Sequence, residues 1–145
     1  MSRDEVAGAV LLDTGPLVAI LSASDTHHNI CVDQLRLVKG PLVTCWPVVT
    51  EAAWLLRGDH AGIAALMSGL ERGPFTLAAL TAPDIAPIGA ILTKYRDLGL
   101  QLADAAIIHL ANREGLDDIF TLDRRDFSVV RKARGKKFRL LPGIA

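Results

Sequence analysis

The apolar run over residues 9–21 constrains the fold more than any other stretch, because a single carboxylate, Asp13, interrupts it. Residues 10–12 are apolar at consecutive positions, which is typical of a short strand buried on both faces of a sheet. Pro16 suits the first turn of a helix, so we expect a helix over residues 17–21. Asp13 then lies at the carboxyl end of a buried strand, where open α/β sheets bind ligands.

Short apolar segments alternate with helical patterns along the rest of the chain. We expect the further strands at residues 42–45, 75–78, 119–122 and 138–141. We expect helices at residues 30–39, 48–57, 61–71, 82–95 and 102–113, a short helix or turn at 123–127, and a frayed lead-in at 1–8. This alternation predicts a three-layer α/β/α sandwich around a parallel sheet. Its 145 residues contain no linker or repeat, which predicts one domain over residues 1–145.

The composition argues against a disordered or membrane-bound chain. Half of the residues are hydrophobic and the mean hydropathy is +0.32, so the chain can bury a core. The first apolar run is too short to cross a bilayer, and Asp4 and Glu5 precede it where a signal peptide carries basic residues. Cys31 and Cys45 have no metal or redox spacing and are expected to be reduced and buried. We therefore expect a cytoplasmic protein without a membrane partner.

Four acidic residues share an unusual position, because each interrupts an apolar segment; they are Asp13, Glu51, Asp104 and Asp123. Asp13 and Asp123 each follow a predicted strand, whereas Glu51 and Asp104 lie in largely apolar helical patterns. Asp126 follows Asp123 by three residues and can share its face. Buried carboxylates are uncommon unless they are paired or bind a metal, so the pattern needs an explanation.

Electrostatics limits what a converging group of these acids can do. Two like charges about 4 Å apart repel by roughly 4 kcal/mol at an effective dielectric constant near 20. Several such pairs would rival the stability of a whole domain, about 5–15 kcal/mol. The group must therefore take up protons or bind a cation. Oxygen ligands without His or Cys favour Mg²⁺ or Mn²⁺, which activate water and neutralise charge on a phosphate.

Each acid also has a structural explanation when it is taken alone. The alternatives are a helix cap for Asp13, Asp104 and Asp123, solvent exposure or pairing with Arg57 for Glu51, and pairing with Arg124 or Arg125 for Asp126. Because these explanations would have to hold independently, the joint pattern favours a site.

The segments that carry these acids resemble the PIN domain, and more closely the VapC-type toxin nucleases. The similarity rests on residues 11–17 (Leu-Leu-Asp-Thr-Gly-Pro-Leu), 49–52, 102–105 and 120–127, in the family's order and spacing. It implies a parallel sheet of about five strands flanked by helices, and a metal-dependent endoribonuclease. Toxins of this kind are usually encoded beside an antitoxin and form dimers, so RNA, a cognate antitoxin and a second copy of the chain are the expected partners.

The resemblance also implies roles for single residues. The acidic quartet of the family is matched by Asp13, Glu51, Asp104 and Asp123. Asp13 and Asp104 are the expected main ligands of Mg²⁺ or Mn²⁺, Asp123 belongs to the metal set, and Glu51 and Asp123 orient the attacking water. Hydroxyl positions beside the site are matched by Thr14 and Thr121, and a further acid of variable role by Asp126.

Half of the 16 basic residues lie within residues 124–139, where Asp126 is the only acid. This asymmetry indicates an anionic partner, and Arg124 and Arg125 are predicted to contact RNA phosphates. The alternative is a solvated, charged surface.

Three bulky side chains are expected to be structural. Trp46 and Trp54 are predicted to lie in the core or at a protein interface, with base stacking as the alternative. His109 is predicted to be structural.

Other functions remain open. The acids suit cleavage of structured DNA as well as RNA, although the small size favours RNA, and a housekeeping PIN nuclease is equally compatible. A phosphoacceptor signalling domain fits poorly, because Leu12 precedes the single Asp13 where that class carries paired acids. A non-catalytic binding module that holds a structural metal, or binds an arginine-rich partner, is a further alternative.

Overall fold

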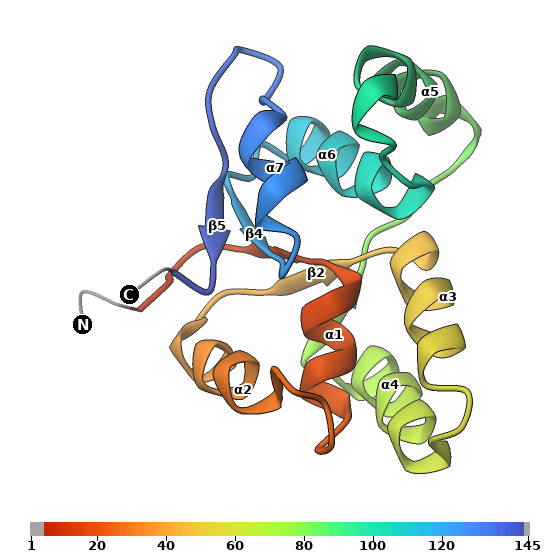
Figure 1. Ribbon diagram of the computed structural model, residues 1–145, viewed down its shortest axis with the longest axis vertical. Helices are drawn as coiled ribbons and strands as arrows, with labels where there is room; N and C mark the ends of the chain where they lie inside the picture. Colours follow the sequence, from red (N-terminus) through yellow and green to blue (C-terminus); the bar gives the residue numbers. More distant parts are fainter. Residues whose placement is uncertain (1–4, 144–145) are drawn as a thin grey trace.

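The computed structural model describes residues 5–143 and contains a five-stranded parallel sheet in the order β3-β2-β1-β4-β5 (Figure 1). The strands are β1 (Val10–Leu12), β2 (Leu42–Thr44), β3 (Phe75–Leu77), β4 (Asp118–Phe120) and β5 (Arg139–Leu141). The helices are α1 (Thr14–Leu21), α2 (His28–Leu37), α3 (Trp46–Leu55), α4 (His60–Arg72), α5 (Ile85–Lys94), α6 (Leu102–Glu114) and α7 (Arg124–Val129). The predicted α/β/α sandwich is confirmed.

The order of the strands decides which helices cover which face. The chain moves outward from β1 through β2 to β3, then returns to β4 and β5 on the other side of β1. Because crossover connections are right-handed, α1 to α4 cover one face of the sheet and α5 to α7 cover the other (Figure 1). The connections that follow β1 and β4 leave in opposite directions, so a crevice forms at the carboxyl ends of these two neighbours.

The central strand β1 is buried along its whole length, as its apolar sequence predicts. Leu11 pairs with Val43 of β2 and with Ile119 of β4. Further fully buried side chains from both helical layers, such as Leu17 and Ile107, pack against the sheet in one core. Within residues 5–143, no helix combines the length and apolar character that crossing a bilayer requires.

Helix α1 begins at Thr14, three residues earlier than predicted. Asp13 has an extended backbone and occupies the N-cap position. Pro16 is therefore still within the first helical turn, where its missing N–H group removes no helical hydrogen bond. The short distance between β1 and α1 keeps Asp13 at the edge of the sheet.

The lead-in before β1 is more ordered than predicted. Val6 forms a parallel bridge with Val38 and is 3% exposed. The Val6 N–H group donates to the Leu37 carbonyl oxygen at 2.8 Å, and the Lys39 N–H group donates to the Val6 carbonyl oxygen at 2.8 Å. The expected frayed lead-in is wrong at this residue, because burial and two backbone hydrogen bonds hold it; residues 1–4 lie outside the described part.

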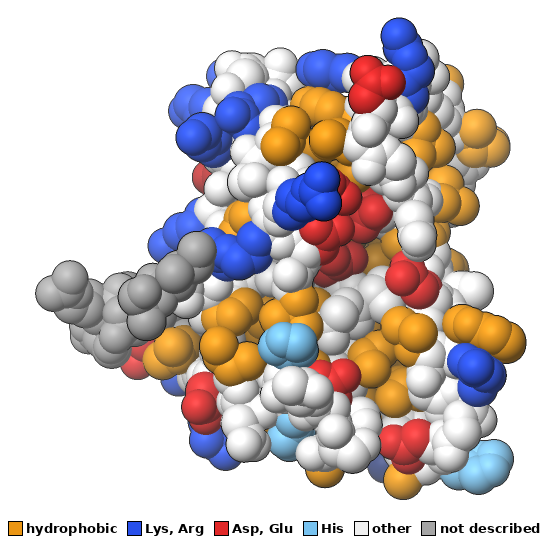
Figure 2. Space-filling model, in the orientation of Figure 1, with side chains coloured by type: hydrophobic (Ala, Val, Ile, Leu, Met, Phe, Trp, Pro, Cys, Tyr) orange, Lys and Arg blue, Asp and Glu red, His pale blue; other side chains and the backbone are white. Residues whose placement is uncertain are grey.

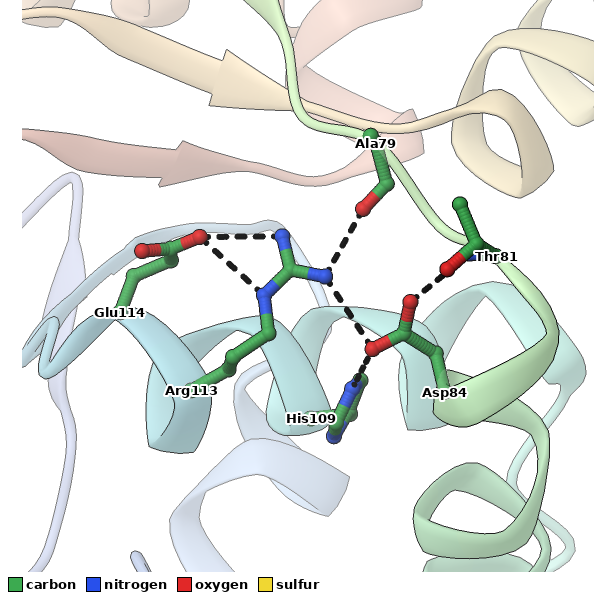
Figure 3. Close-up of polar contacts among 6 residues, drawn as sticks. All are labelled: Ala79, Thr81, Asp84, His109, Arg113 and Glu114. Carbon is green, nitrogen blue, oxygen red and sulfur yellow. Dashed lines mark hydrogen bonds and ion pairs between the residues drawn. The ribbon is translucent and has the colours of Figure 1, made fainter.

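An ionic network around buried Asp84 joins the segment just before α5 to α6 (Figure 3). One oxygen of Asp84 lies 2.7 Å from His109 Nε2 and 3.1 Å from Arg113 Nη1, and the other accepts the Thr81 N–H group at 2.7 Å. These hydrogen bonds lower the pKa of Asp84 to about 2, and the hydrogen bond to His109 has the largest effect. Arg113 also donates to the Ala79 carbonyl oxygen, so the network anchors the chain after β3 to α6. His109 is thus structural, as predicted.

Candidate active site

An acidic cleft of about 400 Å³ opens at the carboxyl ends of β1 and β4, at the predicted crevice. Figure 2 shows acidic side chains gathered in a hollow at the centre of this face, with Lys and Arg side chains beside them. The residues that line the cleft are Asp13, Thr14, Gly15, Glu51, Leu55, Gly99, Gln101, Asp104, Leu122, Asp123 and Asp126. All five acids that the sequence singled out therefore reach one cavity, and their roles there are proposed below.

Asp13 lies at the bottom of the cleft and is 6% exposed. Asp13 occupies the N-cap position of α1, but its carboxylate makes no capping hydrogen bond, so capping does not explain the side chain. Thr121 Oγ1 donates to Asp13 Oδ2 at 2.7 Å. Burial raises the pKa of Asp13 to about 6; the Thr121 hydrogen bond opposes that rise, and the charges of Asp104 and Glu51 add to it.

The Thr121 hydroxyl joins two of the acidic segments. It is fully buried behind the cleft, and while it donates to Asp13 it accepts the Asp123 N–H group at 3.0 Å. The Asp123 side chain caps α7 by accepting the Asp126 N–H group at 3.3 Å. The cap predicted as an alternative for Asp123 is present, and the same side chain also lines the cleft.

Glu51 extends from α3 into the cleft and contacts α1. Thr14 Oγ1 donates to Glu51 Oε2 at 3.3 Å. Arg57 does not pair with Glu51, because its guanidinium lies 3.9 Å from the centre of the Trp54 ring and donates to the Trp54 carbonyl oxygen. The alternative of an ion pair with Arg57 is therefore wrong.

Asp104 enters the cleft from the first turn of α6 and accepts the Gln101 N–H group at 3.0 Å. Burial raises the pKa of Asp104, and the charges of Asp123 and Glu51 add to this rise. Gln101 also lines the cleft, and sequence reasoning missed it. Its spacing of three residues before an acid is that of a capping box, and this signal was available in the sequence.

Asp126 makes no ion pair with the neighbouring arginines in the described part of the chain, so that alternative is wrong. Burial raises its pKa, with a further rise from the charge of Asp123 and a smaller opposing effect from Arg125. Arg124 Nη1 instead donates to the Pro142 carbonyl oxygen at 2.5 Å. Of the two predicted RNA contacts, Arg125 is exposed near Asp126, whereas Arg124 is half-buried and ties α7 to the segment after β5.

The donor set of the cleft consists of oxygen atoms alone and suits a hard divalent cation. Across residues 5–143, no three His, Cys, Asp or Glu side chains are grouped closely enough to hold a metal ion between them. Mg²⁺ usually keeps several waters and binds through one or two carboxylates, so it does not need such a group. Repulsion among the carboxylates, which contributes to the raised pKa values of Asp13, Asp104 and Asp126, is what a cation would relieve.

The sequence model of the PIN domain family matches residues 10–133, which include all five acids of the cleft. The chain belongs to the PIN domain family. The predicted resemblance is thus confirmed. This PIN protein is 34% identical to Ribonuclease VapC26 of Mycobacterium tuberculosis over 136 residues, which is 92% of this chain and 100% of the relative.

Solved structures of VapC proteins share the fold. The structure of VapC20 of Mycobacterium tuberculosis, a toxin that cleaves the sarcin–ricin loop, superimposes with a TM-score of 0.73 and 15% identity, over 80% of this chain and 91% of that one. VapBC2 of Rickettsia felis, bound to a DNA fragment from its promoter, gives a TM-score of 0.62 and 15% identity over 91% and 96% of the two chains. These likenesses confirm the PIN-like sandwich.

Proposed function

We propose that this PIN protein is an endoribonuclease that hydrolyses RNA phosphodiester bonds with Mg²⁺ or Mn²⁺, as the toxin of a toxin–antitoxin pair. The observation that carries the proposal is the acidic cleft, in which Asp13, Glu51, Asp104 and Asp123 meet at the crevice beside β1 and β4. The likeness to a ribonuclease over nearly the whole chain supports the choice of RNA. In this proposal, residues 1–145 form one nuclease domain that acts in the cytoplasm.

The quartet divides into residues that hold the ion and residues that complete the pocket. Asp13 and Asp104 are the main proposed ligands, with Asp123 beside them, and Glu51 and Asp123 orient the attacking water. When bound, the ion activates water and neutralises the charge that develops on the phosphate during in-line displacement.

The hydroxyl groups hold the carboxylates in place. Thr121 fixes one oxygen of Asp13 at 2.7 Å, and Thr14 contacts Glu51 at 3.3 Å. The pKa of Asp13 is about 6, so Asp13 is mostly ionised near neutral pH and is ready to act as a ligand. At lower pH a proton competes with the ion for this carboxylate.

Exposed apolar side chains support the proposed homodimer. Trp46 and Trp54 of α3 are 53% and 63% exposed, and Leu102 of α6 is 57% exposed. All three line an apolar groove that adjoins the cleft through Glu51 and Gln101. Of the two expected positions for the tryptophans, core or interface, their exposure excludes the core, and an exposed apolar patch of this kind is typical of a protein interface. The VapBC2 complex supports an antitoxin as a further partner.

The proposal is tested by cleavage of a mixed RNA pool in Mg²⁺, in Mn²⁺ and in EDTA. We expect cutting by the wild type with either ion and none in EDTA. Asp104→Asn removes a proposed ligand and should abolish cutting. The matched control is Asp97→Asn, because Asp97 is exposed and does not line the cleft. Equal cutting by the wild type and Asp104→Asn, or cutting that persists in EDTA, would contradict the proposal.

A further inference from the structure

The basic segment 124–139 divides into cations that are engaged within the protein and cations that are not. Four of its eight basic side chains have intramolecular partners; they are Arg124 on Pro142, Arg131 on carbonyl oxygens at the end of α7, Lys132 on Asp117 and Arg139 on Asp118. These four contacts lie within the protein, around α7 and the start of β4. Carboxylates neutralise Lys132 and Arg139, and carbonyl oxygens satisfy hydrogen-bond donors of Arg124 and Arg131.

Of the remaining four, Arg125 is exposed on α7, and the other three lie within four residues of one another on the loop between α7 and β5. Arg134, Lys136 and Lys137 are exposed, and in the part of the chain that the structure describes none of their side chains has an ion-pair or hydrogen-bond partner. The two nearest acids along the sheet edge, Asp117 and Asp118, are already paired with Lys132 and Arg139. The loop therefore presents uncompensated positive charge to the solvent.

This loop is ordered by contacts of its backbone. The Ala133 N–H group donates to Asn112 Oδ1 at 2.9 Å, which attaches the loop to α6. The Lys132 N–H group donates to the Lys136 carbonyl oxygen at 2.9 Å, and the Gly135 N–H group donates to the Lys132 carbonyl oxygen at 2.8 Å. Gly135 has φ +78°, a conformation that glycine allows in a tight turn. An ordered loop can bind a ligand without the full entropic cost of ordering three long side chains on a mobile segment.

The loop and the acidic cleft face the same side of the molecule. Figure 2 shows Lys and Arg side chains over the loop between α7 and β5 on the same face as the acidic hollow, with apolar and uncharged side chains between them. Helix α6 relates the two sites, because Asp104 lines the cleft and Asn112 holds the loop eight residues later. At 1.5 Å per residue this separation is about 12 Å along the helix, so an RNA that reaches both sites extends beyond the phosphate in the cleft.

We propose that Arg134, Lys136 and Lys137 form a second RNA-binding surface, which contacts backbone phosphates several nucleotides away from the bond that is cut. The inference rests on the proposed ribonuclease function, and it assigns the substrate to RNA that is long enough to reach both sites. Phosphate contacts dominate the affinity of proteins for nucleic acids and fix register without reading sequence. A membrane surface fits less well, because the aromatic residue of the loop, Phe138, is buried.

The test measures RNA binding separately from cleavage. Asp104→Asn serves as the background, and the loop variant adds Arg134→Gln, Lys136→Gln and Lys137→Gln. Fluorescence anisotropy follows a labelled RNA stem-loop over a salt titration. We expect an affinity about 10- to 100-fold lower at low salt, and a slope of log K against log salt that is smaller by about 2 to 3, since each lost phosphate contact removes about 0.7–0.9.

The matched control removes three exposed cations from the helical layer of α1 to α4, through Arg36→Gln, Lys39→Gln and Arg72→Gln. Its slope should equal that of the background. Lys137→Gln alone should lower the slope by about 0.7–0.9, which is a graded check with little risk to folding. An unchanged slope in the loop variant, or the same loss in the control, would overturn the inference. Loss of binding to anionic vesicles with RNA binding intact would also overturn it.

Cleavage then separates this inference from the proposed function. With an intact Asp104, the loop substitutions should lower kcat/KM on the stem-loop about tenfold more than on a trinucleotide that fills only the cleft. If the wild type cuts no RNA but the loop substitutions still weaken binding of the stem-loop, the proposed nuclease activity is wrong and the proposed binding surface is supported. If the wild type cuts RNA and the loop substitutions change neither binding nor kcat/KM, the nuclease activity is supported and the second binding surface is wrong.

Discussion

Asp13 is the residue at which the stability of the protein and its proposed function conflict. Its pKa is raised to about 6 because the carboxyl is buried. The stability that this group contributes is therefore fully present below its unfolded pKa, near 4, and is lost as the pH rises through about 6. At neutral pH the metal-free protein keeps a buried negative charge that is costly for folding and available for a cation.

Asp13→Asn should separate the two effects. We expect the metal-free variant to be more stable than the wild type by up to about 2–3 kcal/mol near pH 7, and RNA cleavage to fall by at least about 100-fold. Urea denaturation near pH 4 and near pH 7 measures the first effect, and the RNA pool assay measures the second. If the free energies of unfolding of the wild type and the variant change by the same amount between these pH values, the raised pKa of Asp13 is contradicted.

The Thr121 hydroxyl lowers the pKa of Asp13 and so opposes the larger effect of burial. Thr121→Val keeps the shape but removes the hydrogen bond that lowers this pKa. We expect the acidic limb of the pH–activity profile to move to higher pH, while Thr121→Ser keeps the wild-type profile. Initial rates of RNA cleavage across the pH range provide the measurement. If the valine and serine variants have the same profile, the hydroxyl does not set this pKa.

At the scale of elements, the contact between α4 and β3 depends on the absence of a side chain. A Cβ atom on Gly69 of α4 would lie 2.6 Å from two ring carbons of Phe75 in β3. Phe75 is 5% exposed, so the ring has little space into which it can move. A glycine in the middle of a helix usually costs stability, and here close packing explains it.

Gly69→Ala and Gly89→Ala should therefore change stability in opposite directions. We expect Gly69→Ala to destabilise the protein by about 1–3 kcal/mol through overpacking against Phe75. Gly89 lies on exposed α5, and a Cβ atom added there would have no neighbour within 4 Å, so Gly89→Ala should stabilise by about 0.5–1 kcal/mol through helix propensity. Thermal or urea unfolding of both variants decides this, and two changes of the same sign would contradict it.

The elements themselves follow closely from local patterns. The buried run of β1, the proline in the first turn of α3 (Pro47) and the end of α6 at Gly115 are all visible in the sequence. The start of α1 differs from the predicted one because Asp13 itself takes the N-cap position. The 3% exposure of Val6 was not predictable, because it comes from a pairing with Val38, about thirty residues away, that no local pattern shows.

At the scale of the molecule, the cleft should make folding sensitive to divalent ions. An ion that binds only the native state stabilises it by RT ln(1 + [L]/Kd), about 2.7 kcal/mol at a concentration of 100 Kd. We expect Mg²⁺ or Mn²⁺ to raise the melting temperature of the wild type near pH 7, and to do so less near pH 5, where Asp13 is largely protonated.

Differential scanning calorimetry with and without the ion measures this shift. Asp104→Asn should reduce the shift, and Asp97→Asn should keep it, since Asp97 is outside the cleft. The coupling of folding to ion binding would be abandoned if the wild type showed no shift at either pH.

The sequence by itself determined the α/β class, the family resemblance and the acids, because each leaves a local signal: apolar runs of strand length, helical periodicity, or a charge inside an apolar segment. The order of the strands and helices also predicts where two of the acids lie in the fold. Parallel strands place their carboxyl ends at one edge, so the sequence alone leads one to expect Asp13 and Asp123 near each other.

Only the tertiary structure decided which partner each side chain has. The Thr121 hydroxyl reaches Asp13 across 108 positions of sequence, and Arg124 is tied to Pro142 while Arg125 stays exposed. Asp117 and Asp118, at the start of β4, neutralise part of the basic segment and leave the loop cations uncompensated. Such pairings depend on the order of the strands and on the packing of the helices across them, and local periodicity carries no information about either.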